Sequence, residues 1–228
     1  MRALSVSRLA AWIALAAAAL GASGCAAKTT EVQRLQARAA YERGLADLND
    51  GRVALGIAGL KEAVSLDQDV ALYHSSLGAY LLNIKLPETR EQAKLEFKKA
   101  IELEPAYADA HQNLGVALAE EGRWEEAMVE YRKALATPTF AIPDVGYHNL
   151  SFALYNLGRQ REAEEAVRMA ISLNPGLAPA YYTLGLVLLK QSRPEDAKAA
   201  FRRARELDPN SPVGLAAAQH LRALGEGG

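Results

Sequence analysis

The chain has 228 residues, of which 50% are hydrophobic, 23% are charged and 7% are aromatic. Its formal net charge is −1, so the composition gives no sign of the concentrated positive charge with which proteins bind nucleic acid. The single cysteine excludes intramolecular disulfides and zinc sites built from several cysteines. Alanine and leucine are abundant, which favours helices.

The first 25 residues have the pattern of a bacterial export signal. Two arginines precede an apolar stretch from Leu9 to Leu20. This stretch is roughly a dozen residues long, whereas a membrane-spanning helix needs about 20. Small residues then precede Cys25, which favours cleavage after residue 24 and lipidation of Cys25, with an ordinary secretory signal as the alternative. Ala26 follows, as in lipoproteins that are forwarded to the outer membrane.

Between residues 37 and 211 the sequence repeats itself five times. A Leu-Gly pair or a related pair recurs at 43–44, 77–78, 114–115, 150–151 and 184–185, so the spacing is 34 to 37 residues. A small residue follows in each copy, and these residues are Gly56, Ala93, Ala127, Ala163 and Ala197. Four residues later comes a large residue, namely Leu60, Phe97, Tyr131, Val167 and Phe201. Three residues further is always an alanine, namely Ala63, Ala100, Ala134, Ala170 and Ala204.

These recurring positions resemble the tetratricopeptide repeat, in which each copy is a pair of antiparallel helices. A single pair cannot bury its apolar face, so neighbouring pairs stack. Gly51, Gly122 and Gly158 stand at the turn inside a pair, where a left-handed backbone suits glycine. The fold class predicted is an all-α solenoid of about five helix-turn-helix repeats with a C-terminal capping helix.

The predicted organisation follows from this register. Residues 1–24 form the signal peptide, and residues 25–36 form the lipidated cysteine and a tether. The five repeats occupy 37–70, 71–107, 108–141, 144–177 and 178–211. Residues 212–228 form a capping helix, which a solenoid end needs to cover its apolar surface, and a disordered tail.

No catalytic pattern accompanies the repeats. The sequence has no HExxH motif, no glycine-rich phosphate loop and no G-x-S-x-G elbow. His74 and His111 occupy the fourth position of their repeats, where a bulky residue is expected, and we interpret both as packing residues. Trp124 begins the second helix of its repeat and is interpreted as structural. We therefore expect a binding protein without enzymatic activity, cofactor, metal site or small-molecule substrate.

The face formed by the first helices is the predicted binding surface. Positions 2, 5, 9, 12 and 13 of those helices face the inside of a stacked array, where they form an apolar groove with aromatic residues toward its C-terminal half. The predicted groove residues are Tyr41, Leu45, Leu48, Leu82, Val116, His148, Phe152, Tyr155, Asn156, Tyr182, Leu186 and Leu189. Such a groove is typical of a site for an amphipathic helix or an extended segment. Either the end with Tyr41, Leu45 and Leu48 or the aromatic cluster of Phe152, Tyr155 and Tyr182 would bind it, and tight curvature that buries part of the strip is the alternative.

The fifth positions also allow one known mode of peptide binding to be tested. They are occupied by Tyr41, Ser75, Gln112, His148 and Tyr182. A clamp for a C-terminal carboxylate needs lysine among these positions, and none is present. A cytosolic chaperone adaptor is therefore not expected.

The end of the third repeat carries a further resemblance. Ala134 and Leu135 are followed by Pro138, Phe140 and Pro143, and Asn149 comes in the next repeat. With the repeat array, this stretch resembles the pilotin family of type IV pilus systems, and most of all the social gliding motility pilotin of myxobacteria. The resemblance implies an outer-membrane lipoprotein facing the periplasm, which binds secretin subunits and promotes their localisation and multimerisation. The alternative is a lipoprotein scaffold for peptidoglycan hydrolases, proteases or outer-membrane assembly factors.

Overall fold

A computed structural model describes residues 29–226, and Cys25 and the predicted signal lie outside this range. Within it there are eleven α-helices and no strand. The helices are α2 (Glu31–Asn49), α3 (Val53–Leu66), α4 (Ala71–Asn83), α5 (Pro87–Leu103), α6 (Ala108–Glu120), α7 (Trp124–Leu135), α8 (Pro143–Asn156), α9 (Gln160–Leu173), α10 (Ala178–Lys190), α11 (Pro194–Leu207) and α12 (Pro212–Ala223).

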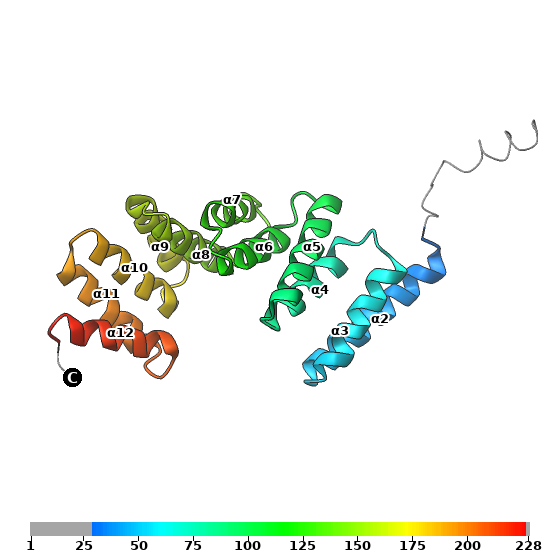
Figure 1. Cartoon of the computed structure of the whole chain (residues 1–228), viewed down its shortest axis with the longest axis horizontal. Coiled ribbons are helices and arrows are strands. Elements are labelled where there is room, and N and C mark those ends of the chain that lie inside the picture. The colour runs from blue at the N-terminus through cyan, green and yellow to red at the C-terminus, as the bar shows by residue number, and fades with distance from the viewer. Residues whose placement is uncertain (1–28, 227–228) are drawn as a thin grey trace, which may run out of the picture.

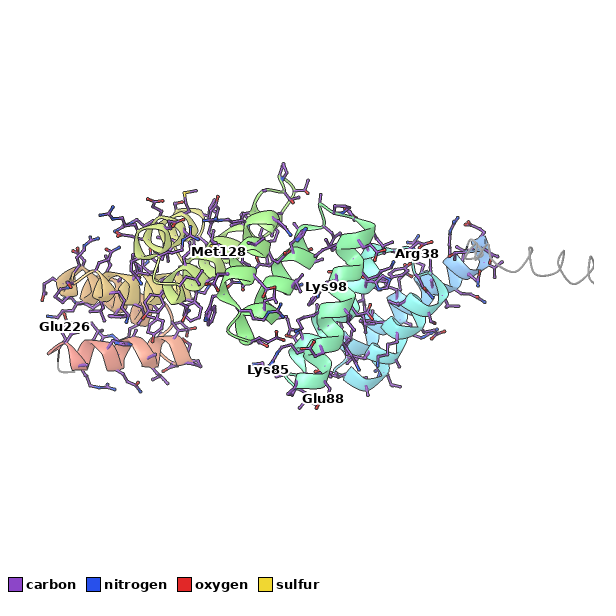
Figure 2. The ribbon with its side chains drawn as sticks, turned by 45° about the horizontal axis from the view of Figure 1, so that its top comes forward. Arg38, Lys85, Glu88, Lys98, Met128 and Glu226 are labelled. Atoms are coloured by element: carbon purple, nitrogen blue, oxygen red, sulfur yellow. The ribbon has the colours of Figure 1, made fainter. Side chains whose placement is uncertain are left out.

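The helices pair in chain order, from α2 with α3 to α10 with α11, and the pairs stack side by side into one elongated array (Figure 1). In the view of Figure 1 the array bends, so that α2 and α12 both lie below its middle. Helix α12 packs against the last pair. Beyond it lies Glu226, which Figure 2 labels and which accepts a hydrogen bond of 3.0 Å from Nε of Arg202. The predicted all-α solenoid with a capping helix is confirmed.

The first helix is longer than its counterparts. It has 19 residues, whereas α4, α6, α8 and α10 have 13 or 14. It begins at Glu31, inside the segment predicted to be a tether. Thr30 and Gln33 explain this start, because Oγ1 of Thr30 accepts from the Gln33 N–H at 3.2 Å and the Gln33 side chain accepts from the Thr30 N–H at 2.9 Å. This reciprocal pair satisfies N–H groups that the first turn of a helix otherwise leaves without partners.

The two helices of a pair approach so closely that one position has room only for a very small residue. A Cβ atom on Gly115 would lie 2.5 Å from Cε1 of Tyr131, a ring that is buried in the facing helix. Gly78 and Gly185 face rings in the same way, and these rings belong to Phe97 and Phe201. The fourth pair differs at both positions, because it has Ser151 in place of the glycine and Val167 in place of the ring. Both are fully buried, so a larger residue on one helix is matched by a smaller one on the other.

The turns inside the pairs use a left-handed backbone residue. Gly51, Gly122 and Gly158 have φ values of 77°, 74° and 72°, which confirms the conformation predicted for them. The other two pairs place non-glycine residues in this conformation, Lys85 with φ 60° and Ser192 with φ 59°. A side chain destabilises this conformation, so these two turns carry strain that glycine would relieve.

His74 and His111 do more than fill space. Nδ1 of His111 lies 2.6 Å from a carboxylate oxygen of Glu130 on the partner helix, and Nε2 lies 3.0 Å from the Pro105 carbonyl oxygen. His74 contacts Glu96 and the Gln68 carbonyl oxygen at the same two distances. Because both ring nitrogens face oxygen acceptors, each ring donates to both only when it is protonated. Each of these two buried histidines therefore joins its own pair of helices, α4 with α5 or α6 with α7, to the turn that precedes the pair.

Candidate protein-binding groove

The first helices α4 and α6 border a hollow of about 390 Å³, which residues 141–142 close on the side of α8. We call this the inner hollow. Its lining residues are Leu72, Ser75, Ser76, Ala79, Tyr107, Asp109, Gln112, Asn113, Ala141 and Ile142. Ser75, Ala79 and Gln112 stand at inner positions of the repeat register, but none of the twelve predicted groove residues lines the inner hollow.

The irregular stretch between the third and fourth repeats positions the wall of the inner hollow. Phe140 is buried, and a Cβ atom on Gly146 would lie 2.7 Å from its ring atom Cε1. The Phe140 N–H donates to the Thr137 carbonyl oxygen at 3.1 Å, and Pro143 begins α8 directly afterwards. Because both ends of the stretch are held in this way, Ile142 stays 44% exposed at the edge of the hollow.

The lining of the inner hollow is mostly apolar but includes two buried polar residues, Ser75 and Gln112. The side chains of Ser75 and Gln112 are 4% and 3% exposed. Within residues 29–226, Oε1 of Gln112 is buried and has no hydrogen-bond partner. Nearly all buried polar groups in folded proteins have a partner, so this oxygen is an exception. Burial raises the pKa of the nearby Tyr107, and the negative charge of Asp109 adds to that rise.

A second part of the groove is aromatic. The rings of Phe152 and Tyr155 stack with their centroids 6.3 Å apart, and the Trp124 ring meets Phe152 edge-on at 5.8 Å. We call these three residues the aromatic shelf. Phe152 is 38% exposed, so its ring is available to a partner. Trp124 also packs against the core, as predicted, and its ring in addition contacts the partly exposed Phe152.

Several predicted groove residues lie in the core or at joints between helices. Leu82 is only 8% exposed, so the prediction that it faces a partner is wrong. Leu48 covers Gly56, because a Cβ atom added to Gly56 would lie 2.3 Å from Cγ of Leu48. The Tyr41 hydroxyl lies 3.0 Å from Oγ of Ser76 on α4. The remaining aliphatic residues of the set are half-buried and pack against the core, and they are Leu45, Val116, Leu186 and Leu189.

The polar and aromatic residues toward the C-terminal end also have partners inside the chain. The Tyr182 hydroxyl lies 3.4 Å from Nε2 of His220 on α12, so the capping helix occupies much of the space beside this ring. Nε2 of His148 lies 3.3 Å from Oγ1 of Thr183, and burial lowers the pKa of this histidine. Asn156 donates to the Phe152 carbonyl oxygen at 2.8 Å.

The opposite side of the array has hollows as well, between successive second helices. One of about 350 Å³ is lined by Lys98 of α5, which Figure 2 labels, and by Val129 and Glu125 of α7. Within residues 29–226, no group of three or more histidine, cysteine and acidic residues is arranged to hold a metal ion. In the same range, no helix is both long and apolar enough to cross a membrane.

Known families and structures match this architecture. The tetratricopeptide repeat family matches residues 96–128, 146–174 and 178–211. The chain is a solenoid of tetratricopeptide repeats. Solved structures with the same fold include PilW, a type IV pilus biogenesis factor, with a TM-score of 0.73, 20% identity and coverage of 86% of this chain and 88% of that one. A structure of Pseudomonas aeruginosa PilF has a TM-score of 0.66 with 18% identity and covers 87% and 96% of the two chains.

Two curated relatives are similar in sequence. The type IV pilus assembly protein PilF of Pseudomonas aeruginosa is 36% identical over 124 residues, which are 54% of this chain and 48% of PilF. The human protein O-mannosyl-transferase TMTC3 is 31% identical over 162 residues, which are 65% of this chain and 17% of TMTC3. The similarity thus spans about half of PilF and a small part of TMTC3. The chain is therefore similar to PilF over about half of the length of each, and the transferase activity is a statement about TMTC3.

Proposed function

We propose that this solenoid is a lipid-anchored outer-membrane protein that binds secretin subunits in its groove and promotes their localisation and multimerisation during type IV pilus assembly. The similarity to PilF carries this proposal, because PilF is a type IV pilus assembly protein and 36% identity extends over 124 residues. The exposed aromatic shelf supports it, because stacked and partly exposed rings offer a surface for another polypeptide.

The mechanism combines shielding with delivery. An apolar secretin segment aggregates if it stays exposed before the subunits assemble, and packing it against Phe152 removes it from water. Lipidation of Cys25 would hold the complex at the membrane where assembly takes place. Anchoring by several acyl chains is stable, whereas a single chain binds a membrane only reversibly.

A charge on the aromatic shelf tests the binding step. Phe152→Asp places a carboxylate on an exposed part of α8, so we expect a folded chain that no longer converts secretin monomers into multimers. Val129→Asp is the matched control, because Val129 is 45% exposed but lies on the opposite side of the array. Multimers are measured by gel electrophoresis of membranes without boiling, and helix content by circular dichroism.

The results separate the proposal from its alternative. Normal secretin multimers in a folded Phe152→Asp variant would exclude the aromatic shelf from the mechanism. Pull-down from membranes that recovers a cell-wall hydrolase or protease in place of a secretin would favour a scaffold. Cys25→Ser tests the anchor independently, since it should release the chain from the membrane fraction while the purified protein still binds secretin.

A further inference from the structure

We propose that the inner hollow holds a basic side chain, lysine or arginine, of the segment that binds in the groove. The inference rests on the proposed function in one respect, which is that a protein segment occupies this face. It adds the chemistry of one contact. This chemistry is opposite to that of a carboxylate clamp, which uses basic residues to hold an acidic group.

The first observation is the unpartnered oxygen of Gln112. Its side chain lines the hollow, is 97% buried, and leaves Oε1 without a donor in the described part of the chain. This oxygen is covered, so the Gln112 amide has to turn toward the hollow before a donor there reaches it. A buried acceptor without a partner destabilises a protein, so such a donor would be favourable. An ammonium or guanidinium group supplies three or five such donors.

The second observation is the charge of the lining. Asp109 is the only charged residue among the ten that line the inner hollow, and it is exposed at α6. A cation near Asp109 would also lie near the hydroxyl groups of Ser75 and Tyr107, which can accept hydrogen bonds. An anionic group would meet an acidic residue and no basic one, so the charge pattern favours a cation.

The third observation is the apolar rim. Leu72 is 42% exposed and Ile142 is 44% exposed, and both line the hollow. Lysine and arginine have long hydrocarbon stems that pack on apolar surface while the charged end reaches polar groups. The hollow of about 390 Å³ has room for such a side chain together with part of the backbone that carries it.

Small cations test this chemistry without the natural partner. Butylguanidinium and butylammonium are titrated into the isotope-labelled full chain in detergent micelles, with neutral butyramide as the matched probe. We expect saturable shifts of the Gln112 and Asn113 side-chain amide signals with both cations and none with butyramide. Asp109→Asn should weaken cation binding about tenfold, because the acceptor keeps its oxygen but loses its negative charge. Glu125→Gln removes a charge outside the groove and should change nothing.

Peptides from the secretin then connect this contact to the proposed function. Peptides of 15 residues that tile the secretin subunit are measured by fluorescence anisotropy. We expect the best binder to contain lysine or arginine, and replacement of that residue by norleucine should weaken binding about tenfold to the wild type. The same replacement should have little effect on binding to a variant that combines Asp109→Asn with Gln112→Met.

The outcomes distinguish the two proposals. Equal shifts with butyramide, or unchanged cation binding in Asp109→Asn, would overturn the basic-side-chain contact even if secretin peptides bind through Phe152. Cation binding that depends on Asp109, together with secretin peptides that do not bind, would support the contact and refute the secretin as partner. A best-binding peptide without a basic residue would also overturn the contact.

Discussion

The close contact between Gly115 and Tyr131 leads to a sharp prediction about how the repeats hold together. The change Gly115→Ala adds one methyl group, which would lie 2.5, 2.7 and 3.1 Å from three atoms of the Tyr131 ring. Favourable contacts between carbon atoms lie at about 3.5–4.0 Å, so the ring has to move by roughly 1 Å. Tyr131 is only 2% exposed and has little free space around it.

The expected loss of stability is about 1–3 kcal/mol, which is typical of extra atoms forced into a packed core. Tyr131→Val alone leaves a cavity and should cost about 2–5 kcal/mol. The double variant should cost at least about 1 kcal/mol less than the sum, because the smaller side chain makes room for the methyl group. This combination imitates the fourth pair, where Ser151 faces Val167. Urea unfolding followed by circular dichroism measures all four free energies.

Additive effects of the two substitutions would refute this reasoning, because they would show that the methyl group and the ring do not compete for space. A stable Gly115→Ala variant would do the same. A matched control is Gly158→Ala, since a Cβ atom there would have no neighbour within 4 Å, and its cost should come from the positive φ angle alone. The substitution Tyr131→Val should therefore leave the free-energy cost of Gly158→Ala unchanged.

Three further predictions concern single features of the structure. Ser192→Gly should raise the free energy of unfolding in urea by about 0.5–1 kcal/mol, because glycine adopts a φ of 59° without strain; a loss would contradict the strain. Phe140→Ala should lower stability by about 3–5 kcal/mol and weaken secretin binding, whereas Phe140→Leu should keep both, as measured by urea unfolding and anisotropy. Hydrogen bonds from His111 and Lys133 outweigh the effect of burial and hold the pKa of Glu130 below its ordinary value of 4.5. The ionised Glu130 therefore stabilises the fold above pH 4.5, and Glu130→Gln should lower the free energy of unfolding by about 1.5–3 kcal/mol at pH 7. This difference should shrink as the pH falls below 4.5, because the carboxylate becomes protonated in the wild type. A difference that does not change with pH would exclude the charge of Glu130 as its source.

The fold could be predicted from the sequence because its determinants recur. Small residues, alanine and large residues return at fixed positions in five copies, and each position has one packing role, as Gly115 and Tyr131 illustrate. The left-handed turns at Gly51, Gly122 and Gly158 were predictable for the same reason. The early start of α2 was not, because its signal is a single local pair, Thr30 and Gln33, outside the repeat.

The site was less predictable, because position in a repeat does not fix how much of a side chain remains exposed. Leu82 and Phe152 both stand at inner positions, yet the first is 8% exposed and the second 38%. Tyr182 is partly covered by α12. Helix α12 is not a copy of the repeat, so the repeat register does not predict which residues it covers. Gln112 was identified in the sequence as the fifth position of its repeat, but only the structure shows that its side-chain oxygen lacks a partner.

The inner hollow arises where the repetition is broken. Regular stacking brings α4 and α6 together, but the third wall is Ala141 and Ile142, which belong to the irregular stretch before α8. Phe140 turns that stretch inward by packing on Gly146, so the ring has a structural role and the isoleucine remains exposed. The five pairs supply the helices that a solenoid needs, whereas this stretch gives one segment of the groove a closed end. A partner that recognises the chain by more than apolar contact is therefore expected to make that recognition at α4, α6 and residues 141–142.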